Sequence, residues 1–362
     1  MISSNFQTFI SIAQLCFILC FVIIGCKNSS KSNNPLPSKE KLLIGEIIFE
    51  NKYNVQNVYF CDDYIVVKNI ANKESSVFSV YKNDVALTHI SDFGRIGNGP
   101  NEFESEVYCT TQFDVNKEGK FFWVYEMNKN KVSQIDLTET IRKKSIVVKK
   151  SVKLKPELSL KEMFYVEENK IIGNPDNLSL SMDQLVIFND KTGIVEKRLP
   201  FAFNVNNERS NDINFTQQNF NTLFVNNLRF NGKRNKLVSG MVTLDRIDIL
   251  NLNGTINKST ETENIDFTSL QENIKNTRIY CSDLYAGDAY IYVLFSGEKM
   301  NKYFEESTPT KVKIYDWNLN LKHVLKTEES LNFITINEKT KTLIGTSSTQ
   351  EKIVKYNLEN IL

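Results

Sequence analysis

The residue types that commonly carry out catalysis are few and scattered in this chain. Its only two histidines, His89 and His323, lie inside runs typical of strands, so a multi-histidine metal site or a histidine-based triad has little to draw on. We interpret both as surface or strand-packing residues. The carboxylate pairs Asp62–Asp63 and Glu305–Glu306 adjoin turn or loop material, where solvated charge is the ordinary explanation and a calcium or glycosidase role is the alternative. The sequence therefore predicts no catalytic residue, no metal site and no cofactor.

The cysteines form no metal or disulfide pattern. Three lie near the N-terminus and three are spread along the rest of the chain: Cys16, Cys20, Cys26, Cys61, Cys109 and Cys281. The last three are too widely spaced for a disulfide framework or for a zinc site with short ligand spacing, and at most one pair could bridge. We expect them to pack as free, small hydrophobic side chains.

Cys26 follows a segment with the features of an export signal. The first 25 residues contain no Asp, Glu, Lys or Arg, and residues 9–25 form an almost unbroken apolar run that ends in Gly25. The run is marginal for a membrane-spanning helix, which needs roughly 20 residues. Residues 23–26, Ile-Ile-Gly-Cys, resemble the lipobox of bacterial lipoproteins, whose cysteine receives a diacylglyceryl group. We predict a signal peptide over residues 1–25 and lipid attachment at Cys26, with a permanent membrane anchor as the alternative.

Residues 26–40 are predicted to form a flexible tether. They are rich in Ser, Asn, Pro and Lys and nearly free of apolar side chains, so they cannot bury enough surface to order themselves. Acyl chains on Cys26 would hold the following domain at a membrane face. The tether lacks the acidic cluster with which similar Bacteroidetes lipoproteins reach the cell surface. This favours a cell-envelope protein that is anchored in the outer membrane and faces the periplasm.

Composition predicts a β-rich domain that does not bind nucleic acid. Apolar residues make up 41% of the chain, with 24 Phe and 14 Tyr, and aromatic side chains favour strands. Lys and Arg number 44 against 43 Asp and Glu, so no overall positive field exists to attract a polyanion.

Internal repeats indicate a β-propeller. An apolar-x-x-apolar pattern, usually closed by Asp or Asn, recurs at Val77–Tyr81, Val132–Asp136, Leu185–Asn189, Ile247–Asn251, Val312–Asp316 and Ile353–Asn357. A second apolar run precedes each copy, at Tyr64–Val67, Phe121–Val124, Lys170–Ile172, Lys236–Val238, Tyr290–Val293 and Thr342–Ile344. Each repeat thus has the makings of a four-stranded blade.

The two ends of the domain predict how the ring closes. The last repeat supplies three strands before Leu362, while Leu42–Phe49 is a spare strand ahead of the first repeat. If the spare strand completes the last blade, no open sheet edge separates the first and last blades. The predicted fold is all-β, a six-bladed β-propeller over residues 41–362 closed by its N-terminal strand, and a pair of β-sandwiches is the alternative.

A glycine-rich loop follows the outer strand of the first repeat. Residues 92–103 read DFGRIGNGPNEF and resemble the G-x-G-x-G-P-G-E-F type loop of six-bladed propeller lipoproteins in Bacteroidetes. With the lipobox and the six repeats, this makes the chain similar to the TolB-like six-bladed propeller lipoprotein family, which implies a fold and an envelope location. The glycines allow a tight passage between blades. Arg95 and Glu102 are the candidate ligand-binding residues, either paired across the loop or pointing into the central channel.

Three further segments could contact a partner. The basic segment Arg142–Lys155 should form the outermost strand of the second blade, where lysines block edge-to-edge association, and contact with anionic lipid or lipopolysaccharide is the alternative. Aromatic-rich patches at Phe201–Phe203 and Phe215–Phe224 lie in the longest gaps between repeats. Insertions of this kind often carry binding, and packing on the blade is the alternative.

The sequence thus predicts a membrane-tethered, non-catalytic binding protein. Its expected partners are the membrane, through Cys26, and a polysaccharide fragment, a peptide or an envelope protein. The competing hypothesis is an envelope hydrolase or lyase with a divalent metal in the propeller channel, because a fold alone does not decide function.

The predicted lipid attachment can be tested at one residue. Replacing Cys26 by Ala removes the thiol that would carry the lipid, so we expect the variant to leave the membrane fraction. Cell fractionation checks this, and a Cys26→Ala protein that still sediments with membranes would contradict the lipidation.

Overall fold

The computed structural model describes residues 40–50, 55–70, 75–99, 102–104, 107–155, 160–175, 183–201, 205–206, 224–260, 265–266, 277–305, 308–347 and 351–362. Pro37–Leu362 forms one compact unit. The signal peptide, Cys26, nearly all of the tether and most of the aromatic-rich patches lie outside the described residues. Among the described helices, none is both long and apolar enough to cross a membrane.

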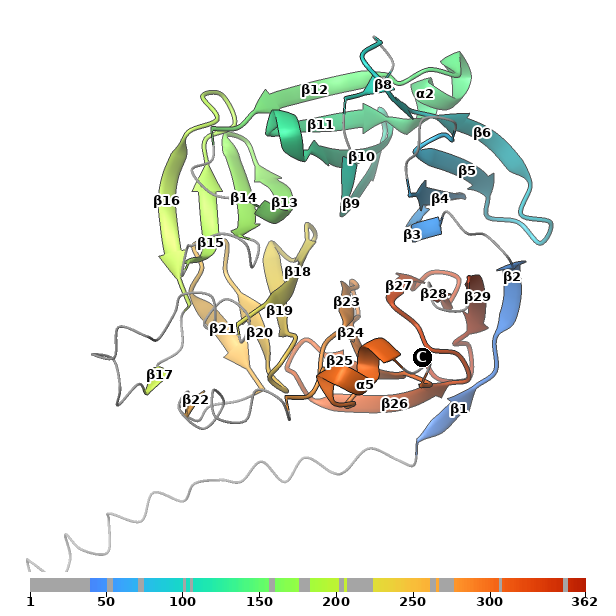
Figure 1. Cartoon of the computed structure of the whole chain (residues 1–362), viewed down its shortest axis with the longest axis vertical. Coiled ribbons are helices and arrows are strands. Elements are labelled where there is room, and N and C mark those ends of the chain that lie inside the picture. Colours follow the sequence, from blue (N-terminus) through green and yellow to red (C-terminus); the bar gives the residue numbers. More distant parts are fainter. Residues whose placement is uncertain are drawn as a thin grey trace, which may run out of the picture. The chain divides into compact units, whose positions relative to one another are not determined.

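Six antiparallel sheets surround a common centre and form a six-bladed β-propeller, as predicted (Figure 1). We number the blades 1 to 6 along the chain and give the strands of each from the centre outward. Blade 1 consists of β3 Val55–Cys61, β4 Tyr64–Asn69, β5 Phe78–Lys82 and β6 His89–Phe93; blade 2 of β9 Val107–Asn116, β10 Gly119–Glu126, β11 Lys131–Asp136 and β12 Val148–Lys153; and blade 3 of β13 Leu160–Glu167, β14 Lys170–Pro175, β15 Asp183–Phe188 and β16 Val195–Pro200. Blade 4 consists of β18 Asn226–Asn231, β19 Lys236–Met241, β20 Ile247–Leu250 and β21 Ile256–Ser259; blade 5 of β23 Asp283–Ala286, β24 Tyr290–Phe295, β25 Lys311–Asp316 and β26 Leu321–Thr327; and blade 6 of β27 Phe333–Asn337, β28 Thr342–Ser347, β29 Lys352–Asn357 and β2 Glu46–Glu50.

The recurring sequence pattern marks the third strand of every blade. These strands, β5, β11, β15, β20, β25 and β29, pair on both sides within their sheets, and blade-to-blade packing buries most of their residues. The closing Asp or Asn shapes the turn that follows. In blade 5, Asp316 Oδ1 accepts the backbone N–H groups of Asn318 and Asn320 at 2.8 and 2.9 Å, and Asn189 Oδ1 accepts that of Lys191 at 2.9 Å in blade 3. The repeat was detectable because each blade needs the same buried strand and the same turn.

The ring closes through the N-terminal segment, which divides between two blades. β2 pairs antiparallel with β29 and completes the last blade, as predicted. Lys41–Leu43, however, forms β1, which pairs parallel with β26 at the outer edge of blade 5. Gly45 permits the step between them, because a Cβ atom there would lie 2.3 Å from Val354 Cγ1. The predicted single strand Leu42–Phe49 is therefore two strands that join the fifth and sixth blades.

The hydrophobic core lies between the blades. The closure packs Val58, Ile65 and Val67 of blade 1 against Ile344 and Ile353 of blade 6. A second cluster, which contains Leu43, fills the space between blades 5 and 6. Burial of this kind contributes roughly 25 cal/mol per Å² of apolar surface, so the closed ring gains stability from every interface between neighbouring blades.

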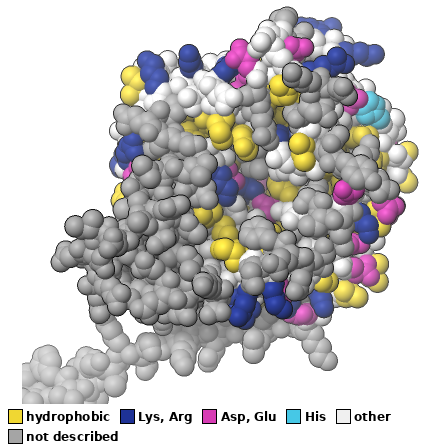
Figure 2. Space-filling view, in the orientation of Figure 1, with side chains coloured by type: hydrophobic (Ala, Val, Ile, Leu, Met, Phe, Trp, Pro, Cys, Tyr) yellow, Lys and Arg dark blue, Asp and Glu magenta, His cyan; other side chains and the backbone are white. Residues whose placement is uncertain are grey.

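The basic segment of blade 2 is only partly a strand. β12 is the outermost strand, as predicted, but Leu137–Lys143 forms helix α2, so Arg142 lies in a helix. The Asp136 side chain caps this helix by accepting the Glu139 N–H at 2.9 Å. Lys and Arg side chains gather along this edge of the molecule (Figure 2).

Two further strand pairs and two short helices complete the described elements. β7 Arg95–Ile96 pairs in parallel with β8 Glu102–Phe103, and β17 Val205–Asn206 pairs in parallel with β22 Ile265–Asp266. The remaining elements are the 3₁₀-helix η1, Met127–Lys129, and the short helix α5, Met300–Glu305.

Two adjacent leucines test the contribution of β1. Leu43 is buried and Leu42 is 60% exposed, although both belong to the same strand. We expect Leu43→Ala to lower the free energy of unfolding by about 2–5 kcal/mol, because it leaves a cavity between blades 5 and 6. Leu42→Ala should change it by less than about 0.5 kcal/mol. Denaturant unfolding of both variants checks this, and equal effects would contradict the position of β1.

Candidate functional site

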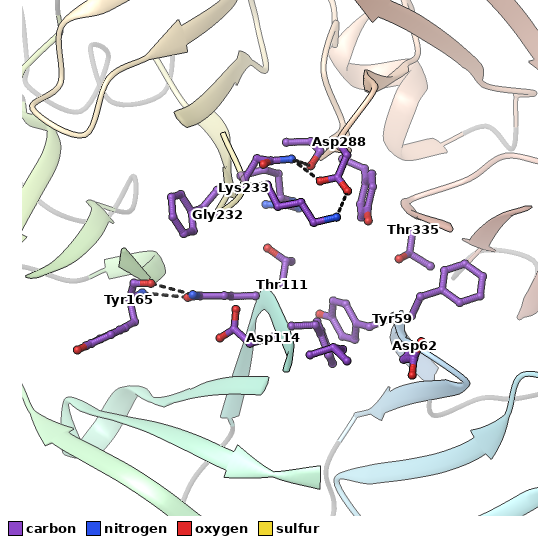
Figure 3. Close-up of a pocket in the computed structure, with 18 of the residues that line it drawn as sticks. Tyr59, Asp62, Thr111, Asp114, Tyr165, Gly232, Lys233, Asp288 and Thr335 are labelled. Carbon is purple, nitrogen blue, oxygen red and sulfur yellow. Dashed lines mark hydrogen bonds and ion pairs between the residues drawn. The ribbon is translucent and has the colours of Figure 1, made fainter. Parts of the chain in front are cut away.

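A cavity of about 760 Å³ lies at the centre of the propeller, and its size suits a small organic ligand. Each blade contributes to its wall from the innermost strand, with Tyr59, Asp114, Tyr165, Arg229, Tyr285 and Thr335 as one residue from each blade. Figure 3 shows these walls around an open centre. A second hollow of about 340 Å³ shares Asp62, Lys233 and Asp288 with the first. Basic and acidic side chains are both visible at the centre of the face in Figure 2.

Arg229 joins three blades beside the cavity. Its side chain is only 9% exposed and pairs with Glu162 of β13 and with Asp283 of β23. Each carboxylate also accepts a backbone N–H from the next blade: Glu162 Oε2 from Leu228 at 2.8 Å, and Asp283 Oδ2 from Ile334 at 2.8 Å. We call Glu162, Arg229 and Asp283 the inter-blade triad. It fixes the relative positions of the innermost strands of blades 3 to 6.

The inter-blade triad keeps charged groups in a buried place. Burial disfavours the charge of Arg229, but Glu162 and Asp283 outweigh it and raise the pKa of the guanidinium. Burial also opposes the charge of Glu162, yet the positive charges of Arg229 and Lys161 hold its pKa below the usual range. For Asp283 the effect of burial exceeds that of Arg229, and the pKa is raised. These opposed shifts follow from one cation shared between two buried carboxylates.

A bulge in β9 brings Thr111 and Gln112 to the cavity wall. The register with β10 shifts between Phe122 and Val124, and Thr111 has a φ of 57°, which is unusual for a β-branched residue. Gln112 Nε2 donates to the Tyr165 carbonyl at 2.8 Å, and Gln112 Oε1 accepts the Tyr165 N–H at 2.9 Å. The bulge thus links blades 2 and 3 and places strained backbone at the site.

Asp114, on the same strand, has no ion-pair partner among the described residues. Trp123 Nε1 donates to Asp114 Oδ2 at 3.2 Å, and Trp123 in turn stacks on the Tyr165 ring at 4.7 Å between centroids. Burial raises the pKa of Asp114, and the hydrogen bonds from Trp123 and Gln112 oppose this only in part. The other acidic residues of the wall are paired, since Asp288 contacts Lys233 and Asp62 lies 3.5 Å from Lys120.

Arg95 and Glu102 lie away from this cavity. They face each other in the register of β7 and β8, both are exposed, and neither lines the central wall. Glu102 Oε2 accepts the Gly99 N–H at 2.8 Å, and a Cβ atom on Gly97 would lie 2.1 Å from the same oxygen. This geometry agrees with a tight passage between blades. Ligand binding by these two residues stays a prediction.

The histidines and cysteines that the sequence offered for chemistry do not line the central wall. His89 lies 3.0 Å from Asp92 on blade 1, and His323 lies on the outer strand β26. Cys61, Cys109 and Cys281 are free, and burial raises the pKa of each thiol to about 12. Within the described ranges, no group of three or more His, Cys, Asp and Glu side chains is placed to hold a metal ion.

Apart from Asp62, which belongs to the carboxylate pair Asp62–Asp63, no pattern in the sequence had singled out the residues of the central wall. Tyr59, Asp114 and Arg229 come from different repeats, far apart in sequence. The one available signal was the position itself: each belongs to the run that precedes a predicted second strand, and such runs form the innermost strands of a propeller.

The fold and the central cavity define the class, a six-bladed β-propeller with a ligand-sized central site. No protein-family model matches the chain, and no curated protein matches its sequence. Solved structures that are similar to it include two propellers from Bacteroides. A member of the DUF4221 family from Bacteroides vulgatus is 11% identical with a TM-score of 0.52, over 88% of this chain and 98% of that one. A candidate exported protein from Bacteroides fragilis is 10% identical with a TM-score of 0.50, over 88% and 93%. These similarities establish the fold and assign no family.

The inter-blade triad predicts a large effect of one substitution. Arg229→Leu leaves Glu162 and Asp283 buried without their cation, so we expect a loss of about 3–5 kcal/mol in the free energy of unfolding at pH 7. The loss should shrink as the pH falls and both carboxylates take up protons. Lys233→Ala, at an exposed ion pair, is the matched control and should cost less than about 1 kcal/mol. Equal effects in denaturant unfolding would show that the triad does not join the blades.

Proposed function

We propose that the protein is a lipid-anchored protein of the cell envelope whose propeller binds a ligand in the central cavity without altering it chemically. The observation that carries the binding proposal is the cavity itself, whose wall is built by all six blades. It combines aromatic side chains with hydroxyl, amide and carboxylate groups, the mixture by which concave sites orient small ligands. A polysaccharide fragment, a peptide or another envelope component is the ligand class that this proposal covers.

The non-catalytic part of the proposal follows from what the reactive groups already do. Glu162 and Asp283 accept backbone N–H groups of neighbouring blades, and both pair with Arg229. The three thiols are protonated at neutral pH because burial raises their pKa. The inter-blade triad therefore serves to join the blades, and the protonated thiols are poor nucleophiles.

The envelope location rests on the N-terminal sequence. The apolar run and the Ile-Ile-Gly-Cys segment that ends at Cys26 support export and lipid attachment. The similar propeller from Bacteroides fragilis is described as a candidate exported protein, which agrees with this address. A tether then leaves the propeller free to meet ligands near the membrane face.

The binding proposal can be tested by filling the cavity. Thr335 is only 3% exposed and projects into the site from β27 (Figure 3). The mature protein would be incubated with oligosaccharides and peptides from bacterial envelopes, and bound species would be detected by native mass spectrometry. We expect a bound ligand with the wild type and its loss in Thr335→Trp, because the indole occupies the ligand's space.

The control places the same side chain on the surface. Ile194 is half-exposed in the turn between β15 and β16, so Ile194→Trp should bind as the wild type does. Thr335→Leu changes the same position but adds less volume than Trp. If it binds the ligand and Thr335→Trp does not, the loss of binding is due to the filled cavity and not to misfolding. If Thr335→Trp binds the ligand as well as the wild type does, the ligand does not bind in the central cavity. A chemically altered ligand, or a stoichiometric metal ion in the purified protein, would contradict the non-catalytic part of the proposal.

A further inference from the structure

Among the described acidic residues of the cavity wall, Asp114 differs from the others because no cation lies beside it. Arg229 is neutralised by Glu162 and Asp283, and Lys233 by Asp288. Lys339 lies exposed on the turn between β27 and β28. Within the described part of the chain, Asp114 alone among the acidic residues of this wall has no cation as partner. Asp114 is therefore the wall carboxylate that the described residues leave without an ion-pair partner.

The protein positions this carboxylate firmly. Asp114 lies on β9, which contacts β3 on one side and β13 on the other. Trp123 Nε1 holds one carboxylate oxygen at 3.2 Å, and the indole is itself fixed by stacking on Tyr165. The Gln112 side chain also hydrogen-bonds this carboxylate and, like Trp123, favours its charged form. A carboxylate kept in place by a buried donor loses little conformational entropy when a ligand binds.

The rest of the cavity wall is suited to the cationic group and the carbon atoms of a ligand that contacts Asp114. Aromatic side chains reach the cavity from four blades, at Tyr59, Phe230, Tyr285 and Phe333. Their ring faces attract cations and cover apolar carbon atoms. The hydroxyl groups of Thr111 and Thr335 line the same space, and both can accept hydrogen bonds from an N–H donor.

We propose that the central cavity binds the primary ammonium group of its ligand, with Asp114 as the counter-charge and the aromatic wall around the adjoining carbon atoms. The inference rests on the proposed function and names the chemistry that the site would select. An amino sugar and the amino terminus of a peptide share this group. A partly buried carboxylate favours such a ligand because ion pairing offsets the cost of removing its charge from water.

Matched pairs of probes test the ammonium group. Isothermal titration of the mature protein would compare glucosamine with N-acetylglucosamine, and triglycine amide with its N-acetylated form. We expect at least one free amine to bind about tenfold or more tightly than its acetylated partner, as a charge-assisted hydrogen bond implies. The pair that shows the preference identifies the source as a sugar or a peptide.

Two variants assign the preference to one residue. Asp114→Asn keeps the shape of the side chain and removes its charge, so the preference for the free amine should fall about tenfold. Asp288→Asn changes a wall carboxylate that already pairs with Lys233 and should retain the preference. If free and acetylated probes bind equally well, and Thr335→Trp abolishes the binding of both, the ammonium assignment is overturned. The proposal of a central binding site then still holds. Failure of both free amines to bind would also overturn it.

Discussion

Neighbouring blades of this propeller have to be joined by side chains, because their innermost strands belong to separate sheets. The β-ladder satisfies backbone groups within a blade, but the inner strands face one another across the centre with no ladder between them. The inter-blade triad solves this for blades 3 to 6 by combining one buried guanidinium with two carboxylates that also accept backbone N–H groups. A buried charge is tolerated only when it is paired and hydrogen-bonded. The rest of the central architecture depends on this arrangement.

Side-chain contacts also join other neighbouring blades, but they use different residue types. The Gln112 amide pairs with both backbone groups of Tyr165 between blades 2 and 3, and Glu338 accepts the N–H groups of Ala289 and Tyr290 between blades 6 and 5 at 2.9 and 3.1 Å. Between blades 6 and 1 the contact is aromatic, with the Tyr59 and Phe333 rings 5.2 Å apart. Because most charged groups near the centre are engaged in ion pairs, a carboxylate that has none is informative. This is why Asp114 stands out within a wall that also carries several other charged residues.

Sequence reasoning located the blades well and the site poorly. The third strands were predictable because each carries buried apolar residues. In every repeat but the first, an Asp or Asn also closes the pattern, and Asp316 shows how it shapes the next turn. The closing strand was predictable in position but not in its division, because only three-dimensional packing shows that Leu43 belongs to blade 5 and Phe49 to blade 6. Helix α2 was missed because its short amphipathic run depends on the Asp136 cap. The glycine-rich loop drew attention to Arg95 and Glu102, which lie outside the central wall.

The sequence by itself determined the class of fold, since a buried strand and its turn must repeat once per blade and leave the same local pattern each time. It also carries the whole case for export and lipid attachment, which depends on a contiguous segment ending at Cys26. Only the tertiary structure decided which residues meet at the centre. Tyr59, Asp114 and Arg229 are separated by long stretches of sequence, and ring closure brings them to one cavity. Contacts between distant repeats leave no local pattern, because each residue is chosen for a partner that lies in another blade.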